Sequence, residues 1–216
     1  LGRGVMGTTG EWYQGQFLMP YWASPDLTPE GNSWGIARVG FPGGDQVTWE
    51  RIATWPAIPG QSGGNEAPVE PGLQILSGGR GRVITRTEPG AGLGFVVTTS
   101  DVNFANWSTP EVWSVPDVAA NADNGALQRV EGGRIIFENP RPNGGYAAFA
   151  RSPTTGRLYM MFPNHPTARI RPTVFGSEDD GETWPRARLL DLATAPSGTQ
   201  APYTRLTCTN DGRLFC

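Results

Sequence analysis

The chain has 216 residues, and its 30 Gly and 20 Pro place a residue that interrupts helices at roughly every fourth position, which excludes long helices. The net charge is −3, all 17 basic residues are Arg, and no block of like charge occurs, so the basic surface that nucleic acid requires is absent. No apolar run reaches the roughly 20 residues of a membrane span. A hydrophobic fraction of 38% with 8 Trp is enough for a packed core, and the composition predicts a β-rich globular protein.

Short strand-like runs alternate with turn sequences along the whole chain. The clearest runs are 16–19, 35–39, 82–85, 134–137 and 157–162. Pro-Gly, Gly-Gly, Asn-Gly and Asp-Gly pairs between them are typical of antiparallel hairpins, and no linker interrupts the pattern. Arg80, just before the run 82–85, and Arg82, its first residue, are expected to be surface charges. We expect one all-β domain over residues 1–216, built as a sandwich, a barrel or a propeller.

One segment, 177–184, decides between these architectures. It fits the pattern S-x-D-x-G-x-T-W at every fixed position, which are Ser177, Asp179, Gly181, Thr183 and Trp184. In such a turn the Asp accepts backbone N–H bonds, the Gly supplies a positive φ, and the Trp folds back into the sheet. The segment resembles the Asp-box, the structural turn between the outer strands of blades in sialidase-type β-propellers. Two decayed copies that keep the Trp are found at 42–49 and 100–107.

Four further stretches, in family order, resemble the catalytic blades of the sialidases (neuraminidases, exo-α-sialidase type). They are Gly2–Met6 with Gly15–Pro20, Gly64–Glu66 with Val83–Arg86, His165–Arg169 ahead of the Asp-box, and Ala201–Leu206 with Asp211–Cys216. The resemblance covers almost the whole chain. It implies a six-bladed propeller, of which residues 1–216 would form an interior fragment of about four blades, truncated at both ends.

The resemblance also implies an activity, the removal of terminal sialic acid from glycoproteins, glycolipids or oligosaccharides with retention of configuration. Arg86 and Arg169 match two of the three family arginines that bind the carboxylate of the sugar, and Tyr203 matches the nucleophile. A phenol suits this role because a charged carboxylate nucleophile would be repelled by the substrate carboxylate. With an ordinary pKa of about 10, the phenol needs a base, and Glu66 matches it.

Several alternatives stay open at this stage. Glu70 competes with Glu66 for the role of base, and Arg171 shares a strand face with Arg169. The acid/base Asp and the first Arg of the family lie in a blade that this chain does not contain, so the fragment alone is expected to be inactive. Transfer of sialic acid to an acceptor, or action on a related nonulosonic acid, would depend on loops that the sequence does not define. The competing hypothesis is a non-catalytic Asp-box propeller that binds glycan or protein.

No cofactor is required by the implied chemistry, and no metal site is expected, because one His and two Cys cannot form a His/Cys cluster. Cys208 and Cys216 either face each other across a hairpin turned at Asn210-Asp211-Gly212 or are two free small apolar residues, and the second interpretation is favoured. Secretion is suggested by the family resemblance alone.

Overall fold

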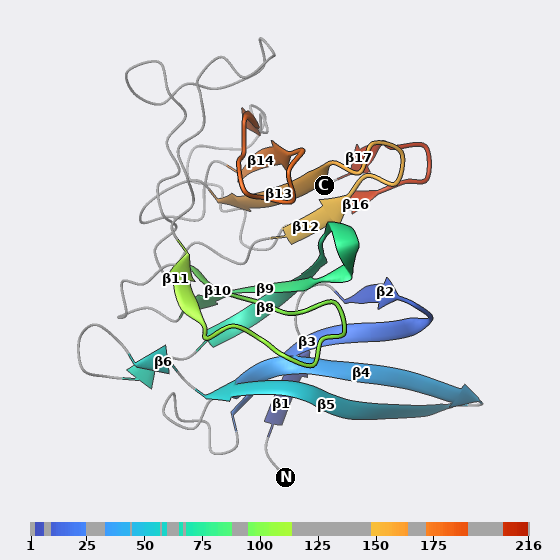
Figure 1. Ribbon diagram of the computed structural model, residues 1–216, viewed down its shortest axis with the longest axis vertical. Helices are drawn as coiled ribbons and strands as arrows, with labels where there is room; N and C mark the ends of the chain where they lie inside the picture. The colour runs from blue at the N-terminus through green and yellow to red at the C-terminus, as the bar shows by residue number, and fades with distance from the viewer. Residues whose placement is uncertain are drawn as a thin grey trace, which may run out of the picture. The chain divides into compact units, whose positions relative to one another are not determined.

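The fold was analysed in a computed structural model of the chain (Figure 1). The structure describes residues 3–6, 10–24, 33–43, 45–56, 58–59, 65–66, 68–87, 95–113, 148–163, 172–189 and 205–215. Apart from one 3-10 turn, η2 (Ser77–Gly79), the regular structure in these residues is entirely β, and no helix among them is long and apolar enough to cross a membrane. The chain divides into two compact units, residues 1–113 and 114–216.

The first sheet of unit 1, sheet I, is an antiparallel meander. It contains β1 (Arg3–Met6), β2 (Glu11–Tyr13), β3 (Gln16–Ser24), β4 (Ser33–Gly43) and β5 (Gln46–Pro56). β1 pairs with the second half of β3 and β2 pairs with its first half, so β1 and β2 together act as one interrupted edge strand. The β2–β3 turn has positive φ at both Gln14 and Gly15, the backbone that a tight two-residue hairpin requires.

The second sheet of unit 1, sheet II, repeats this arrangement with four strands. They are β8 (Pro68–Ile75), β9 (Gly81–Thr87), β10 (Phe95–Thr99) and β11 (Glu111–Trp113), each paired antiparallel with the next. Sheets I and II share one apolar core, which contains eight buried side chains: Leu18, Trp34, Ile36 and Trp55 from sheet I, Leu73, Val83 and Val96 from sheet II, and Phe104 from the loop after β10. The two sheets of unit 1 therefore pack face to face through large apolar residues.

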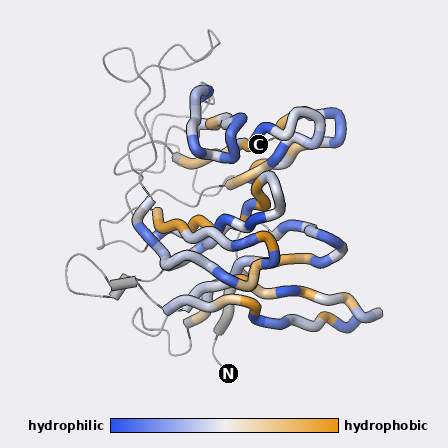
Figure 2. Tube along the Cα trace, in the orientation of Figure 1, coloured by the Kyte–Doolittle hydropathy of each residue, from blue (hydrophilic) through white to orange (hydrophobic). Residues whose placement is uncertain are grey.

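Unit 2 contains a third meander, sheet III. Its strands are β12 (Ala148–Arg151), β13 (Leu158–Pro163), β14 (Pro172–Ser177) and β15 (Arg186–Leu189). A short hairpin, β16 (Thr207–Cys208) with β17 (Leu214–Phe215), contributes Leu206, Cys208 and Leu214 to the apolar cluster on one face of this sheet. Figure 2 shows apolar stretches within the strands and largely hydrophilic turns in this unit.

Four of the five strand-like runs in the sequence fall on observed strands. The runs 16–19, 35–39 and 82–85 lie within β3, β4 and β9, and the run 157–162 overlaps β13, which begins and ends one residue later. The run 134–137 lies outside the described residues. Repetition of a four-stranded antiparallel meander is typical of propeller blades, so the fold class expected from the sequence, all-β, is confirmed.

Candidate functional site

Arg86 is the predicted site residue whose side-chain environment is best described. It lies on β9 between Val69 of β8 and Phe95 of β10, and it is 7% exposed. Its Nε donates a hydrogen bond to Oε2 of Glu70 at 2.5 Å, and the two side chains form an ion pair that is largely shielded from water. Removing one partner of such a pair leaves the other charge buried without compensation, which typically costs about 3–5 kcal/mol.

A β-bulge brings Glu70 to Arg86. Val69 pairs with Arg86 and Gly72 pairs with Ile84, so Glu70 and Pro71 together lie opposite one residue of β9. Glu70 has a φ of +54°, a left-handed conformation that is uncommon for a non-glycine residue. Pro71 has no N–H to donate to the ladder, so a bulge is the place in a sheet where it fits. The bulge turns the Glu70 side chain out of the normal alternation of β8.

Of the two candidate carboxylates, the structure describes the side chain of Glu70 alone. Glu66 lies on β7 (Asn65–Glu66), whose backbone pairs with β6 (Ile58–Pro59), and its side chain is outside the described part of the chain. Glu70 contacts Arg86 directly. The sequence feature that could have indicated this contact is the Pro71-Gly72 pair. A Pro followed by a Gly inside a strand-like run indicates a bulge, and the bulge is what brings Glu70 to Arg86.

The remaining predicted residues of the site, Arg169 and Tyr203, lie outside the described residues, as does the alternative Arg171. Their roles therefore stay predictions. Arg86 and Glu70 are the candidate site residues that the structure brings together among those it describes.

One sequence-based expectation near Arg86 is wrong. Arg80 is exposed as expected, but Arg82 is buried, with 8% of its surface exposed. Arg82 and Arg86 are four residues apart on β9, so both side chains leave the same face of sheet II. The alternation of side chains along a strand could not predict that Arg82 is buried, because alternation does not indicate which face of a sheet is covered by other residues.

The 177–184 turn joins β14 to β15 and is held by side-chain contacts at its fixed positions. The Asp179 carboxylate accepts bonds from the Thr183 N–H at 2.8 Å, the Thr183 hydroxyl at 2.5 Å and the Ser177 hydroxyl at 2.7 Å. Ser177 Oγ in turn accepts the Gly181 N–H at 2.7 Å, Gly181 has a φ of +85°, and Trp184 is 2% exposed. All of these partners lie within the turn, so these hydrogen bonds hold the turn in its conformation.

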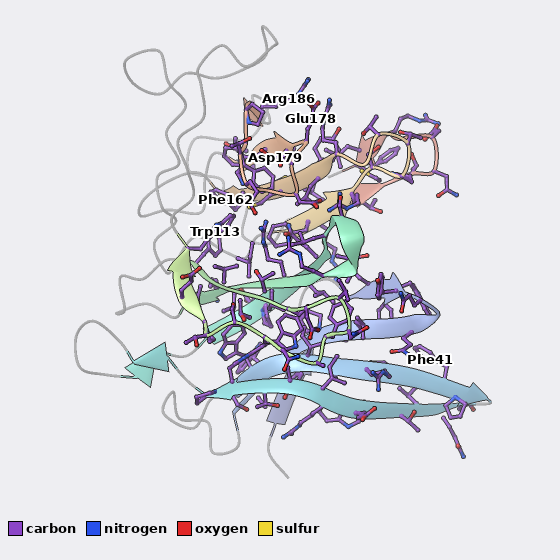
Figure 3. All side chains as sticks on the ribbon, in the orientation of Figure 1. Phe41, Trp113, Phe162, Glu178, Asp179 and Arg186 are labelled. Atoms are coloured by element: carbon purple, nitrogen blue, oxygen red, sulfur yellow. The ribbon has the colours of Figure 1, made fainter. Side chains whose placement is uncertain are left out.

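Three ion pairs involve acidic side chains of this turn. Glu178 pairs with Arg157 at 2.5 Å and with Arg186 at 3.1 Å (Figure 3), and Asp180 pairs with Arg151 at 2.6 Å. The hydrogen bond from Arg157, followed by the charge of Arg186, lowers the pKa of the Glu178 carboxyl. The pairs made by Arg151 and Arg157 connect the β12–β13 hairpin with the β14–β15 turn, and none of the three pairs involves a predicted catalytic residue.

The two weaker copies of this turn occupy the same place in their own sheets. Segment 42–49 joins β4 to β5 and segment 100–107 joins β10 to β11, in each case the third strand to the fourth. In the second of these, Asp101 accepts backbone N–H bonds from Asn103, Ala105 and Asn106. The three segments are thus topologically equivalent although only 177–184 has the complete pattern.

Cys208 is a free thiol, as the sequence favours, and burial raises its pKa. The hairpin register places Cys208 opposite Leu214, while Cys216 lies outside the described residues. Among the described side chains, no group of three or more His, Cys, Asp or Glu is placed to hold a metal ion.

Comparison with solved structures identifies the fold. A Hadza microbial sialidase matches with a TM-score of 0.55 and 16% identity over 94% of this chain. An α-L-arabinanase from Penicillium chrysogenum in complex with arabinobiose has a TM-score of 0.51 and 15% identity over 98% of the chain, and the leech intramolecular trans-sialidase has a TM-score of 0.51 and 14% identity over 93%. No family model and no curated protein matches the sequence.

These neighbours are β-propeller glycoside hydrolases, and the chain has their fold. It spans 33% of the microbial sialidase, 57% of the arabinanase and 25% of the trans-sialidase. At these identities the likeness defines the fold class, so the substrate and the reaction have to be argued from the site itself.

Proposed function

We propose that residues 1–216 are part of a propeller glycoside hydrolase that removes terminal sialic acid from glycoconjugates. The observation that carries this proposal is the Arg86–Glu70 pair: a nearly buried guanidinium at a position that matches a family carboxylate-binding arginine, fixed by a strained carboxylate residue in a bulge. Strained backbone of this kind is concentrated at functional sites. The two sialidases among the structural neighbours support the same substrate class.

The substrate explains why such an arginine is useful. The anomeric carbon of sialic acid bears a carboxylate, and the planar guanidinium fork of Arg binds a carboxylate through two parallel N–H bonds. The ion pair between Glu70 and Nε of Arg86 restricts the rotation of the guanidinium. Arg169 is the second proposed carboxylate ligand.

The proposed reaction is a double displacement with retention of configuration. The Tyr203 oxygen attacks the anomeric carbon while a glutamate takes the phenolic proton, and the bond to the leaving oxygen breaks as an acid outside residues 1–216 protonates it. Water then attacks the anomeric carbon and gives one proton to the deprotonated acid group, while the tyrosyl–sugar bond breaks and the glutamate returns its proton to the Tyr203 oxygen. Glu66 is the proposed base, and Glu70 is the alternative that the bulge places beside Arg86.

The decisive test uses the complete polypeptide that contains these residues and a fluorogenic sialoside. Tyr203→Phe removes the oxygen that forms the covalent intermediate, so turnover is expected to fall by at least 1,000-fold, on the order of the loss for an essential catalytic group. Tyr13→Phe is the matched control, because the Tyr13 hydroxyl accepts its hydrogen bond from exposed Gln14. Near-normal turnover by Tyr203→Phe would show that the nucleophile is wrongly assigned.

The roles of Glu66 and Glu70 can be distinguished by the kinetic constant that each substitution changes. Loss of the base lowers kcat, whereas loss of the group that orients Arg86 raises KM and weakens carboxylate-bearing inhibitors. We expect Glu66→Gln to lower kcat, and Arg86→Lys and Glu70→Gln to raise KM. Exposed Arg80 provides the control Arg80→Lys. A fall in kcat confined to Glu70→Gln would assign the base to Glu70.

A neutral sugar is the second candidate substrate, since the arabinanase match covers 98% of the chain. An α-L-arabinoside assayed beside the sialoside distinguishes the two. Cleavage of the arabinoside but not the sialoside would show that the substrate is an arabinoside. If neither compound is cleaved but the protein binds glycan, the non-catalytic propeller is favoured.

A further inference from the structure

The cross-strand row that contains Arg86 ends in a tryptophan. Phe95 of β10 lies directly opposite Arg86, and Trp113, the last residue of β11 (Figure 3), lies directly opposite Phe95. Residues that face each other across antiparallel strands project from the same side of a sheet, so Arg86, Phe95 and Trp113 share one face of sheet II. Adjacent strands are about 4.8 Å apart, which puts the backbone of Trp113 roughly 10 Å from that of Arg86.

The Trp113 side chain is half-buried and has a free polar group. Its ring packs against Phe95, with the ring centroids 6.2 Å apart, and Phe95 is 1% exposed. Among the described residues, the indole N–H of Trp113 has no hydrogen-bond partner, yet it is not one of the indole nitrogens that are buried without a partner, which are those of Trp22 and Trp184. The N–H of Trp113 is therefore accessible to an acceptor.

The face that carries Trp113 is not the face that packs on sheet I. Val83 belongs to the core shared by the two sheets and lies three residues before Arg86 on β9, so these two side chains project from opposite faces. Trp55, near the end of the outer strand β5 of sheet I, is by contrast a member of that core. Packing between sheets I and II therefore accounts for Trp55 but not for Trp113.

Glu111 adds a negative charge beside this tryptophan. It lies two residues before Trp113 on β11, so it projects from the same face, and it is exposed. The indole ring offers an apolar surface with one N–H donor, and the carboxylate accepts hydrogen bonds from hydroxyl groups. A sugar ring presents C–H groups together with hydroxyls, and a second anionic group would be repelled by Glu111. The chemistry of this edge of sheet II therefore fits a neutral sugar.

We propose that Trp113 binds the sugar to which the terminal sialic acid is attached, and that this sugar is a neutral pyranose. The inference rests on the proposed function, because Arg86 has to hold the carboxylate of the sialic acid for the next ring to reach Trp113. A separation of about two strand spacings fits that next ring better than the sialic acid itself. The indole stacks on the C–H face of the pyranose, and its N–H donates to a hydroxyl group. Trp113 takes no part in bond cleavage.

Two sialosides distinguish this role from the reaction itself. Sialyllactose has a neutral sugar next to the sialic acid, whereas the methyl sialoside has none. In the complete polypeptide, Trp113→Ala should lower kcat/KM for sialyllactose roughly 10-fold, which corresponds to the loss of an aromatic contact of about 1.4 kcal/mol. The value for the methyl sialoside should be unchanged. Trp12→Ala, at a 65% exposed tryptophan of sheet I, is the matched control and should change neither value.

The outcomes separate this inference from the proposed function. An equal loss on both sialosides would show that Trp113 supports the site as a whole, and no loss on either would show that it does not contact the sugar. Both results overturn the inference and leave the proposed function standing. If the unsubstituted polypeptide cleaves neither sialoside, the proposed function fails and the inference fails with it. Faster cleavage of a disialoside than of sialyllactose would overturn the assignment of a neutral sugar.

A second variant applies if Trp113→Ala does not fold. Trp113→Phe keeps an aromatic ring on Phe95 and removes the indole N–H. It should lower kcat/KM for sialyllactose by a smaller factor than the alanine variant and leave the methyl sialoside unchanged. Equal values of kcat/KM for Trp113→Phe and the unsubstituted polypeptide on both sialosides would overturn the hydrogen bond from the indole N–H to the sugar.

Discussion

At the scale of single residues, Asp179 shows how one carboxylate holds a turn in place. Burial raises the pKa of this carboxyl, but the hydrogen bonds from the Thr183 hydroxyl, the Thr183 N–H and Ser177 outweigh burial, so its pKa lies below the ordinary value of 3.8. A group whose pKa is lower in the folded state stabilises that state above its unfolded pKa. This contribution is lost as the pH falls through the pKa of the folded state.

Asp179→Asn should therefore reduce stability at pH 7 and reduce it less in acid. Losing the charged acceptor costs about 1–3 kcal/mol at neutral pH, and the difference from wild type should shrink as the pH falls below 3.8. Urea unfolding monitored by Trp fluorescence between pH 7 and pH 2.5 measures it. Because Asp101, Glu178 and Asp211 also have lowered pKa values, the difference between the two proteins is the quantity to follow. A difference that is constant with pH would contradict this role.

Trp184, at the end of the same turn, is expected to be one of the most costly residues to truncate. It is 2% exposed, and deletion of a buried indole leaves a cavity in the sheet. Trp184→Ala should lower the free energy of unfolding by about 3–5 kcal/mol, while Trp184→Phe should lose less because a ring remains. Equal losses for the two variants would mean that ring packing does not account for the effect.

At the scale of elements, the approach of neighbouring strands in sheet I depends on a glycine. Gly35 on β4 pairs with Tyr21 of β3 and Thr54 of β5, and a Cβ at this position would overlap the Ala53 carbonyl and lie 2.8 Å from the Tyr21 hydroxyl. The Tyr21 hydroxyl also bonds Thr54 Oγ1 at 2.5 Å across the sheet. A side chain at residue 35 would therefore separate strands that are joined by hydrogen bonds.

Gly35→Ala should destabilise the protein by about 1–3 kcal/mol, because the β4–β5 pairing must shift to admit the methyl group. Gly176→Ala, near the end of β14, is the matched control, since its Cβ would meet no heavy atom closer than 3.5 Å. Thermal unfolding of both variants compares them. A Gly35→Ala protein as stable as Gly176→Ala would disprove the steric argument.

At the scale of the whole molecule, sheets are joined through apolar faces rather than through shared strands. In unit 1 this contact is the core between sheets I and II, and Leu73 on β8 is completely buried in it. In unit 2, Leu206, Cys208 and Leu214 pack on Ala148, Ala150, Met161 and Val174 of sheet III. Loss of volume in either cluster weakens the contact between sheets and leaves the strand pairing within each sheet intact.

Leu73→Ala should cost about 2–5 kcal/mol, the usual range for a leucine truncated in a core. Val102→Ala, at an exposed position of the same unit, should change stability by less than about 0.5 kcal/mol. Denaturant unfolding gives both values. A small loss for Leu73→Ala would indicate that the two sheets do not stabilise each other through this core.

The sequence by itself predicted what depends on neighbours along the chain. The frequency of Gly and Pro indicated an all-β fold, and the hairpin turned at Asn210-Asp211-Gly212 is present with Gly212 at a φ of +82°. The 177–184 segment forms a turn whose hydrogen bonds join residues at most four positions apart. Such contacts depend on residues that are close in the sequence and little on the rest of the molecule, so a local pattern is sufficient to predict them.

The tertiary structure showed that Arg82 is covered and that the Glu70 carboxylate contacts Arg86. Arg82 was expected at the surface and is buried, because burial depends on what packs on a sheet face and not on the strand itself. The contact of Glu70 with Arg86 joins residues 16 positions apart, and it exists because the β8–β9 register places a bulge opposite one residue of β9. Register is set by the pairing of two strands and the packing of their faces, which a linear pattern does not contain.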